Sequence, residues 1–235
     1  MNKENFLVGI VGLLSGLIIG FMFANSVNQQ VVRPVGAEAK TNSNMPAGHP
    51  DIGSTGGTGT SGAMQPEVQA AIENAKQSPG DFDAQLKAAE SFYQIEKYDD
   101  AITYLTAANK IRPDDREVLV HLGNANFDGD HFAEAEKWYN VALAKKADDV
   151  NVRTDLGLTF VFRPTPDYDR AIQEFNRSLA IDPNHIQTLQ NLTVAYTKKG
   201  DAAKANATLA KLEGLEPSNK SILKLKDDIQ KMGVK

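Results

Sequence analysis

The 235-residue chain contains no cysteine, and its basic side chains are fewer than its acidic ones. The absence of cysteine excludes disulfides, thiolate metal sites, a cysteine nucleophile and a lipid-modified N-terminal cysteine. The 25 Lys and Arg residues stand against 30 Asp and Glu residues, which gives a formal net charge of −5. No block of Lys and Arg reverses this balance locally, so the composition gives no electrostatic reason to bind nucleic acid.

The sequence also lacks the short motifs that carry common enzyme chemistry. It has neither a phosphate-binding glycine loop nor a G-x-S-x-G elbow. Its four histidines are scattered, at His49, His121, His131 and His185. His131 and Glu134 have a spacing that can share a metal, but no further ligand accompanies them. The sequence therefore predicts a protein that is not an enzyme and that has no resident cofactor or metal.

One long uncharged run is present, at residues 6–24, after a tail of residues 1–5. As a helix it would span roughly 28 Å, close to the hydrocarbon core of a bilayer. Its length favours a single-pass membrane anchor, because signal-peptide cores are usually about 7–15 residues long. Residues 24–26 still form an acceptable cleavage site, so a cleaved signal peptide stays open. Lys3 before the run favours a cytoplasmic N-terminus, with the rest of the chain on the extracytoplasmic (periplasmic) side.

Within this run, Gly12, Gly16 and Gly20 recur every four residues and fall on one side of the expected helix. Small residues at this spacing let two helices approach closely in lipid, which suggests association with a second copy or with a partner's helix. Glycine is also common in membrane helices that do not associate.

Residues 25–65 read as a flexible linker, because ten consecutive Gly, Ser and Thr residues occupy 53–62. Such a segment cannot offset its ordering entropy by apolar burial. About 40 residues would reach roughly 35 Å as a random coil. Met45 and His49 lie close together here; they are a metal- or haem-ligating pair or, the interpretation we favour, a chance pair in a linker.

From residue 66 the sequence becomes helical in period and repeats itself. Four units cover 82–115, 116–149, 150–185 and 186–219, and the third is two residues longer than the others. A small residue opens each second helix, at Ala101, Ala135, Ala171 and Ala205. Proline ends three of the units, at Pro113, Pro183 and Pro217. Alanine allows close helix packing, and proline cannot continue a helix, so each unit predicts a helical hairpin.

The stretches HLGNANFDGDHFAEAEKWYNVALAKKADD (121–149) and AIQEFNRSLAIDPN (171–184) resemble the tetratricopeptide repeat family. The resemblance implies an all-α fold, a TPR-like α-solenoid of four hairpins. A covering helix at 66–81 and a capping helix at 220–235 are expected to flank it. The chain departs from the family pattern at Gln85, Asn126, Arg153 and Thr193.

The same resemblance implies that the first helix of each unit lines a concave groove for a partner protein, as a peptide or an amphipathic helix. The implied groove residues are Leu86, Glu90, Tyr93, Val120, Asn124, Phe127, Thr154, Leu158, Val161, Gln190 and Val194. They predict an apolar floor with acidic residues at one end and amides at the other, and about half of them are expected to be exposed.

Together these features predict a membrane-tethered adaptor for protein–protein interaction. Two alternatives stay open: an adaptor that resembles those of cytochrome c maturation and presents apocytochrome, and a structural assembly factor of an envelope complex.

Overall fold

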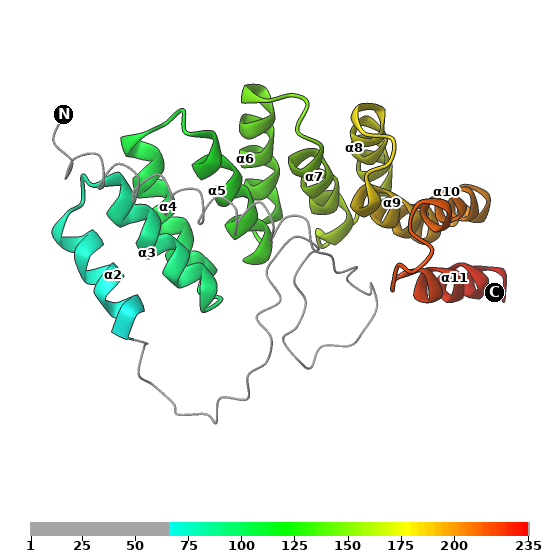
Figure 1. The fold of residues 1–235 in the computed structure, drawn as a ribbon, viewed down its shortest axis with the longest axis horizontal. Coiled ribbons are helices and arrows are strands. Elements are labelled where there is room, and N and C mark those ends of the chain that lie inside the picture. Colours follow the sequence, from blue (N-terminus) through cyan, green and yellow to red (C-terminus); the bar gives the residue numbers. More distant parts are fainter. Residues whose placement is uncertain (1–65, 235) are drawn as a thin grey trace, which may run out of the picture. The chain divides into compact units, whose positions relative to one another are not determined.

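The computed structural model describes residues 66–234, which form a row of α-helices (Figure 1). The ten helices are α2 (Pro66–Gln77), α3 (Phe82–Gln94), α4 (Tyr98–Ile111), α5 (Arg116–Asp128), α6 (Phe132–Lys145), α7 (Val150–Phe162), α8 (Tyr168–Ile181), α9 (Ile186–Lys199), α10 (Ala202–Leu215) and α11 (Ile222–Gln230). A 3-10 turn, η1 (Lys231–Val234), follows α11. The predicted all-α solenoid is confirmed for this part of the chain.

Successive helices pack in pairs, and each pair falls inside one of the repeat units read from the sequence. The most extensive contacts join α3 to α4, α5 to α6, α7 to α8 and α9 to α10. The second helix of each of the first three pairs then packs on the first helix of the next. Helix α2 covers α3 at one end, and α11 packs on α10 and α9 at the other (Figure 1).

Aspartate starts five of these helices, because its carboxylate accepts hydrogen bonds from backbone N–H groups that have no partner within the first turn. The N-cap residues are Asp81, Asp115, Asp149, Asp167 and Asp201. Gly200 ends α9 in the left-handed conformation, with φ of 88°, which glycine adopts without strain.

The two extra residues of the third unit form a longer turn between α7 and α8 without changing how the turn closes. The N–H of Asp167 donates to the carbonyl of Phe160 at 2.8 Å, and in the second unit His131 donates to Asn126 at the same distance. The longer turn also places the Arg163 guanidinium 4.6 Å from the centroid of the Phe160 ring. The insertion therefore preserves the hairpin and adds a cation–π contact.

Two glycines let a first helix approach an aromatic ring of the second helix. A Cβ at Gly123 would lie 2.4 Å from a ring carbon of Tyr139, and one at Gly157 would lie 2.5 Å from a ring carbon of Phe175. Both rings are fully buried. Glycine at the eighth position of the second and third units therefore meets a steric requirement of this packing.

The departures from the family pattern are accommodated by local polar partners. The Gln85 amide donates to the carbonyl of Ala75 at 2.8 Å, which ties α3 to α2. Arg153 pairs with Glu174 at 3.0 Å between α7 and α8, and both side chains are largely buried. A charged pair thus fills a position where the family often has a large apolar side chain.

The predicted membrane anchor at 6–24, with Gly12, Gly16 and Gly20, lies outside the described residues, as does the predicted linker at 25–65. Within 66–234, none of the helices is both long enough and apolar enough to span a bilayer.

Candidate functional site: the inner face of the first helices

The first helices of the hairpins lie on the inner side of the curve. Helix α7 contacts α9, and α9 contacts α11, whereas no two second helices make contacts as extensive in the described part of the chain. When alternate helices of a curved stack contact each other, they lie on its inner side, where the distance between repeats is shorter. We call the surface formed by α3, α5, α7 and α9 the concave face.

The structure divides the eleven predicted groove residues into a buried set and a partly exposed set. Six are partly exposed: Leu86, Glu90, Tyr93, Val120, Asn124 and Val194. Five are buried: Phe127, Thr154, Leu158, Val161 and Gln190. Phe127 packs edge-on against Phe132 and Phe162, so its ring belongs to the core. Binding of a partner by the exposed set stays a prediction.

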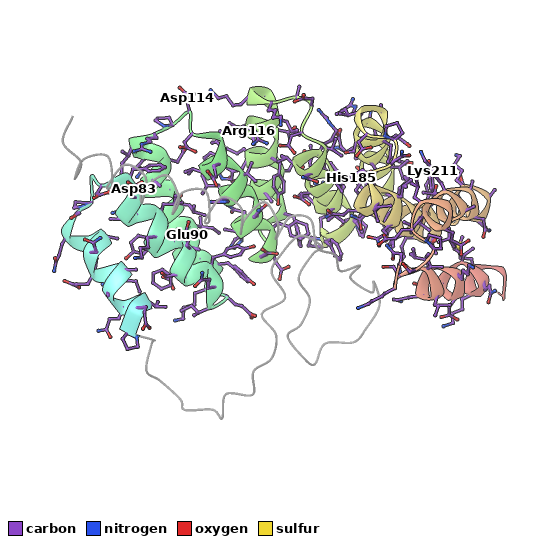
Figure 2. The ribbon with its side chains drawn as sticks, in the orientation of Figure 1. Asp83, Glu90, Asp114, Arg116, His185 and Lys211 are labelled. Carbon is purple, nitrogen blue, oxygen red and sulfur yellow. The ribbon has the colours of Figure 1, made fainter. Side chains whose placement is uncertain are left out.

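Carboxyl groups gather at the N-terminal end of the concave face. Asp83 and Glu90 lie two helical turns apart along α3 (Figure 2), and Glu117 begins the next first helix. Burial and then the neighbouring Glu117 raise the pKa of Glu90 from 4.5 to about 7. Burial also raises the pKa of Glu117, with a further contribution from Asp115. Negative charge at this end is therefore poorly compensated.

A second acidic pair lies farther along the same face, at Asp128 and Asp155. Tyr93 donates a hydrogen bond to Asp128, which links α3 to α5. Burial, together with the nearby carboxylates of Asp149 and Asp128, raises the pKa of Asp155 well above its ordinary range. Since burial and like charges both disfavour ionisation, a cation placed at Asp155 would stabilise the ionised form of this carboxyl group.

Tyr139 carries a polar group from the second helix toward this pair. Its ring occupies the space that Gly123 leaves, and its hydroxyl donates to Oδ1 of Asn124 at 2.8 Å. With Oδ1 engaged, the amide nitrogen of Asn124 is the group left to donate to a ligand. Among the four units, only the second has a hydroxyl at the position of Tyr139. The equivalent residues of the first, third and fourth units are Leu105, Phe175 and Leu209.

Compensating positive charge on this face is scarce. Lys87 on α3 lowers the pKa of Glu90 only in part. Burial lowers the pKa of His121 on α5 to about 4, so this histidine is neutral at physiological pH. Within residues 66–234, no group of three or more His, Asp or Glu side chains is arranged to hold a metal ion. The concave face is thus a partly apolar surface with buried and half-buried carboxyl groups.

This arrangement of helices agrees with the comparison to family models. Models described as "Tetratricopeptide repeat" match residues 65–115, 86–150 and 167–229. The chain belongs to the tetratricopeptide repeat family. It is thus a scaffold for protein–protein interaction, whose partners are proteins or peptides, and the family is typically not enzymatic.

Solved structures of other proteins share the fold. A crystal structure of MamA is 25% identical, with a TM-score of 0.57, and the match covers 64% of this chain and 81% of that one. MamA 41-end from Desulfovibrio magneticus RS-1 is 17% identical, with a TM-score of 0.55 and coverage of 68% and 100%. YrrB, described as "a TPR protein with an unusual peptide-binding site", is 19% identical, with a TM-score of 0.59 and coverage of 68% and 81%.

Asp128, Asp155 and Tyr139 are site residues that sequence reasoning did not select. They occupy the thirteenth, sixth and twenty-fourth positions of their units, whereas the groove residues that the resemblance implied stand at the fifth, ninth and twelfth positions. An acidic residue in the middle of a first helix that is rich in apolar residues was the available signal for Asp155.

Proposed function

We propose that the concave face binds a partner segment that is apolar on one side and carries Lys or Arg. The observation that carries the proposal is the set of inward carboxyl groups whose ionisation is unfavourable without a ligand, above all Glu90 and Asp155. A bound cation would stabilise the ionised forms, while Leu86, Val120 and Val194 offer apolar contact. Asn124 would donate to a carbonyl of the bound segment.

We further propose that residues 6–24 hold this scaffold at a membrane, on its extracytoplasmic side, and that residues 25–65 act as the tether. The uncharged run and the Gly, Ser and Thr segment support this part. Presentation of apocytochrome and assembly of an envelope complex remain alternative hypotheses for what the captured partner is.

The cation preference can be tested with peptides selected from a random display library on the wild-type chain. Each selected Arg is then replaced by citrulline, which keeps its shape and removes its charge. We expect the Arg peptide to bind at least about tenfold more tightly, which corresponds to roughly 1.4 kcal/mol. Binding should also release protons and strengthen as the pH rises through the Glu90 pKa of about 7.

The matched control separates a local effect from the loss of a carboxyl group elsewhere. Asp155→Asn and Glu134→Gln each replace one carboxyl group by an amide, and Glu134 is exposed on a second helix. Asp155→Asn should erase the preference for Arg over citrulline, whereas Glu134→Gln should leave it. Equal affinity of the wild-type chain for the two peptides would show that the carboxyl groups do not select a cation.

A further inference from the structure

Three buried hydroxyl groups meet at the junction between the third and fourth repeats. Thr154 on α7, Ser178 on α8 and Thr188 on α9 are each fully buried. Oγ1 of Thr154 lies 2.7 Å from Oγ1 of Thr188 and 3.3 Å from Oγ of Ser178. We call these three residues the hydroxyl seam.

The two preceding junctions carry apolar side chains at the same repeat positions. The equivalent residues are Leu86, Ala108 and Val118 at the first junction, and Val120, Ala142 and Val152 at the second. At the first junction, Ala108 and Val118 belong to one apolar cluster, with Leu86 packed against it. The array therefore changes from apolar to polar contact between repeats at one position along its length.

The hydroxyl seam is internally satisfied. Thr154 donates to the carbonyl of Val150 at 2.7 Å, which leaves its oxygen free to accept from Thr188. Nδ1 of His185, at the start of α9 (Figure 2), lies 2.6 Å from the Thr188 hydroxyl and completes the chain as its donor. When a junction opens, hydroxyl groups replace their lost hydrogen bonds with hydrogen bonds to water, whereas apolar surfaces lose their burial and gain no such compensation. Opening a polar contact therefore costs less free energy than opening an apolar one.

The segment beyond the hydroxyl seam has an apolar core of its own. The buried members are Leu189, Ala205, Leu209, Leu212, Ile222, Leu225 and Ile229, which come from α9, α10 and α11. These helices are held to one another by apolar burial. Their attachment to the third repeat combines an apolar contact from Leu179 of α8, which packs against this core, with the polar contact of the hydroxyl seam.

We propose that the junction between the third and fourth repeats is an opening joint, at which α9–α11 separate as one unit while α3–α8 stay folded. In a stack where each repeat contacts only its neighbours, the junction with the weakest interface opens first. Opening there would change the curvature of the C-terminal end of the concave face. The joint does not depend on the binding proposal, because it concerns the unliganded chain.

Hydrogen exchange of the full-length chain, followed by mass spectrometry, tests the joint directly. In the wild type, α9, α10 and α11 should exchange with one common protection, lower than that of α5–α8. Simple fraying of the chain end would instead protect α10 more than α11 and α9 more than α10. A graded pattern, or equal protection of α9 and α5, would overturn the proposal.

Two variants move the joint in opposite directions. The triple change Thr154→Val, Ser178→Ala and Thr188→Val gives this junction the side chains of the second junction, and it should slow exchange in α9–α11 by about tenfold or more. The converse change, Val120→Thr, Ala142→Ser and Val152→Thr, should make α7–α11 exchange faster as one block. If the first variant leaves exchange unchanged, or loses helicity by circular dichroism, the hydroxyl seam does not weaken the junction.

Discussion

Replacing Gly123 by alanine should destabilise the chain, although alanine is the better helix former. The general preference of a helix interior for Ala over Gly is worth about 1 kcal/mol. At Gly123 the new Cβ would lie 2.4 and 2.5 Å from two ring carbons of Tyr139, where carbon atoms normally stay about 3.5–4.0 Å apart. The ring is 1% exposed and its hydroxyl is bonded to Asn124, so it has little room to move. Overpacking of this kind costs about 1–3 kcal/mol, and the confined ring places this site in the upper part of that range, at about 2–3 kcal/mol. After the gain in helix propensity, we expect a net loss of roughly 1–2 kcal/mol.

Gly214 on α10 provides the matched control, because no atom lies within 4 Å of the position its Cβ would take. Gly214→Ala should therefore stabilise the chain by about 0.5–1 kcal/mol or less, since the residue lies near the helix end. Urea denaturation followed by circular dichroism would give both values from the shift in midpoint. A Gly123→Ala chain as stable as wild type, beside a stabilised Gly214→Ala chain, would refute the close packing of α5 on α6.

Other changes test single contacts. Glu174→Ala leaves the Arg153 charge buried without this partner and should lower the free energy of unfolding by about 3–5 kcal/mol. Changing both Arg153 and Glu174 to leucine should leave that free energy nearly unchanged. Equal losses for the two variants in urea denaturation would contradict the buried pair. Asp81→Ala removes an N-cap that accepts from backbone amides at 3.0 and 3.2 Å and should cost about 1 kcal/mol in thermal unfolding; an unchanged midpoint would contradict it. Folding raises the pKa of Glu90 from 4.5 to about 7, so the folded chain holds a proton that the unfolded chain releases; stability should fall as the pH rises between these values, and Glu90→Gln should flatten that slope. Tyr139→Phe removes the hydrogen bond to Asn124 and should lower the free energy of unfolding by about 1 kcal/mol, measured by calorimetry. An unchanged free energy would show that water in the unfolded chain satisfies the hydroxyl as well as Asn124 does in the folded chain.

The helical repeat was readable from sequence because it rests on local signals that recur in phase. Alanines at the helix crossing and prolines at unit ends each have a direct structural consequence at that position. The division of groove residues into buried and exposed was not readable, because it depends on neighbouring helices. Phe127 has the pattern of a groove residue, yet its ring lies against Phe132 and Phe162.

The polar features of the site were least predictable, because they involve residues far apart in sequence. Tyr139 reaches Asn124 only because Gly123 leaves space for its ring. The hydroxyl seam joins Thr154 and Thr188 across 34 residues. A family pattern records the residue usual at each position, and it does not show which unusual residues meet.

Site-specific photocrosslinking in the native host tests most directly whether the concave face holds the partner. A photoreactive phenylalanine analogue would replace Val120, which is partly exposed on α5, or Val141, which is 36% exposed on the second helix α6. We predict a discrete crosslinked protein from position 120 and none from position 141. A crosslink from position 141 with none from position 120 would place the partner on the outer surface and contradict the account.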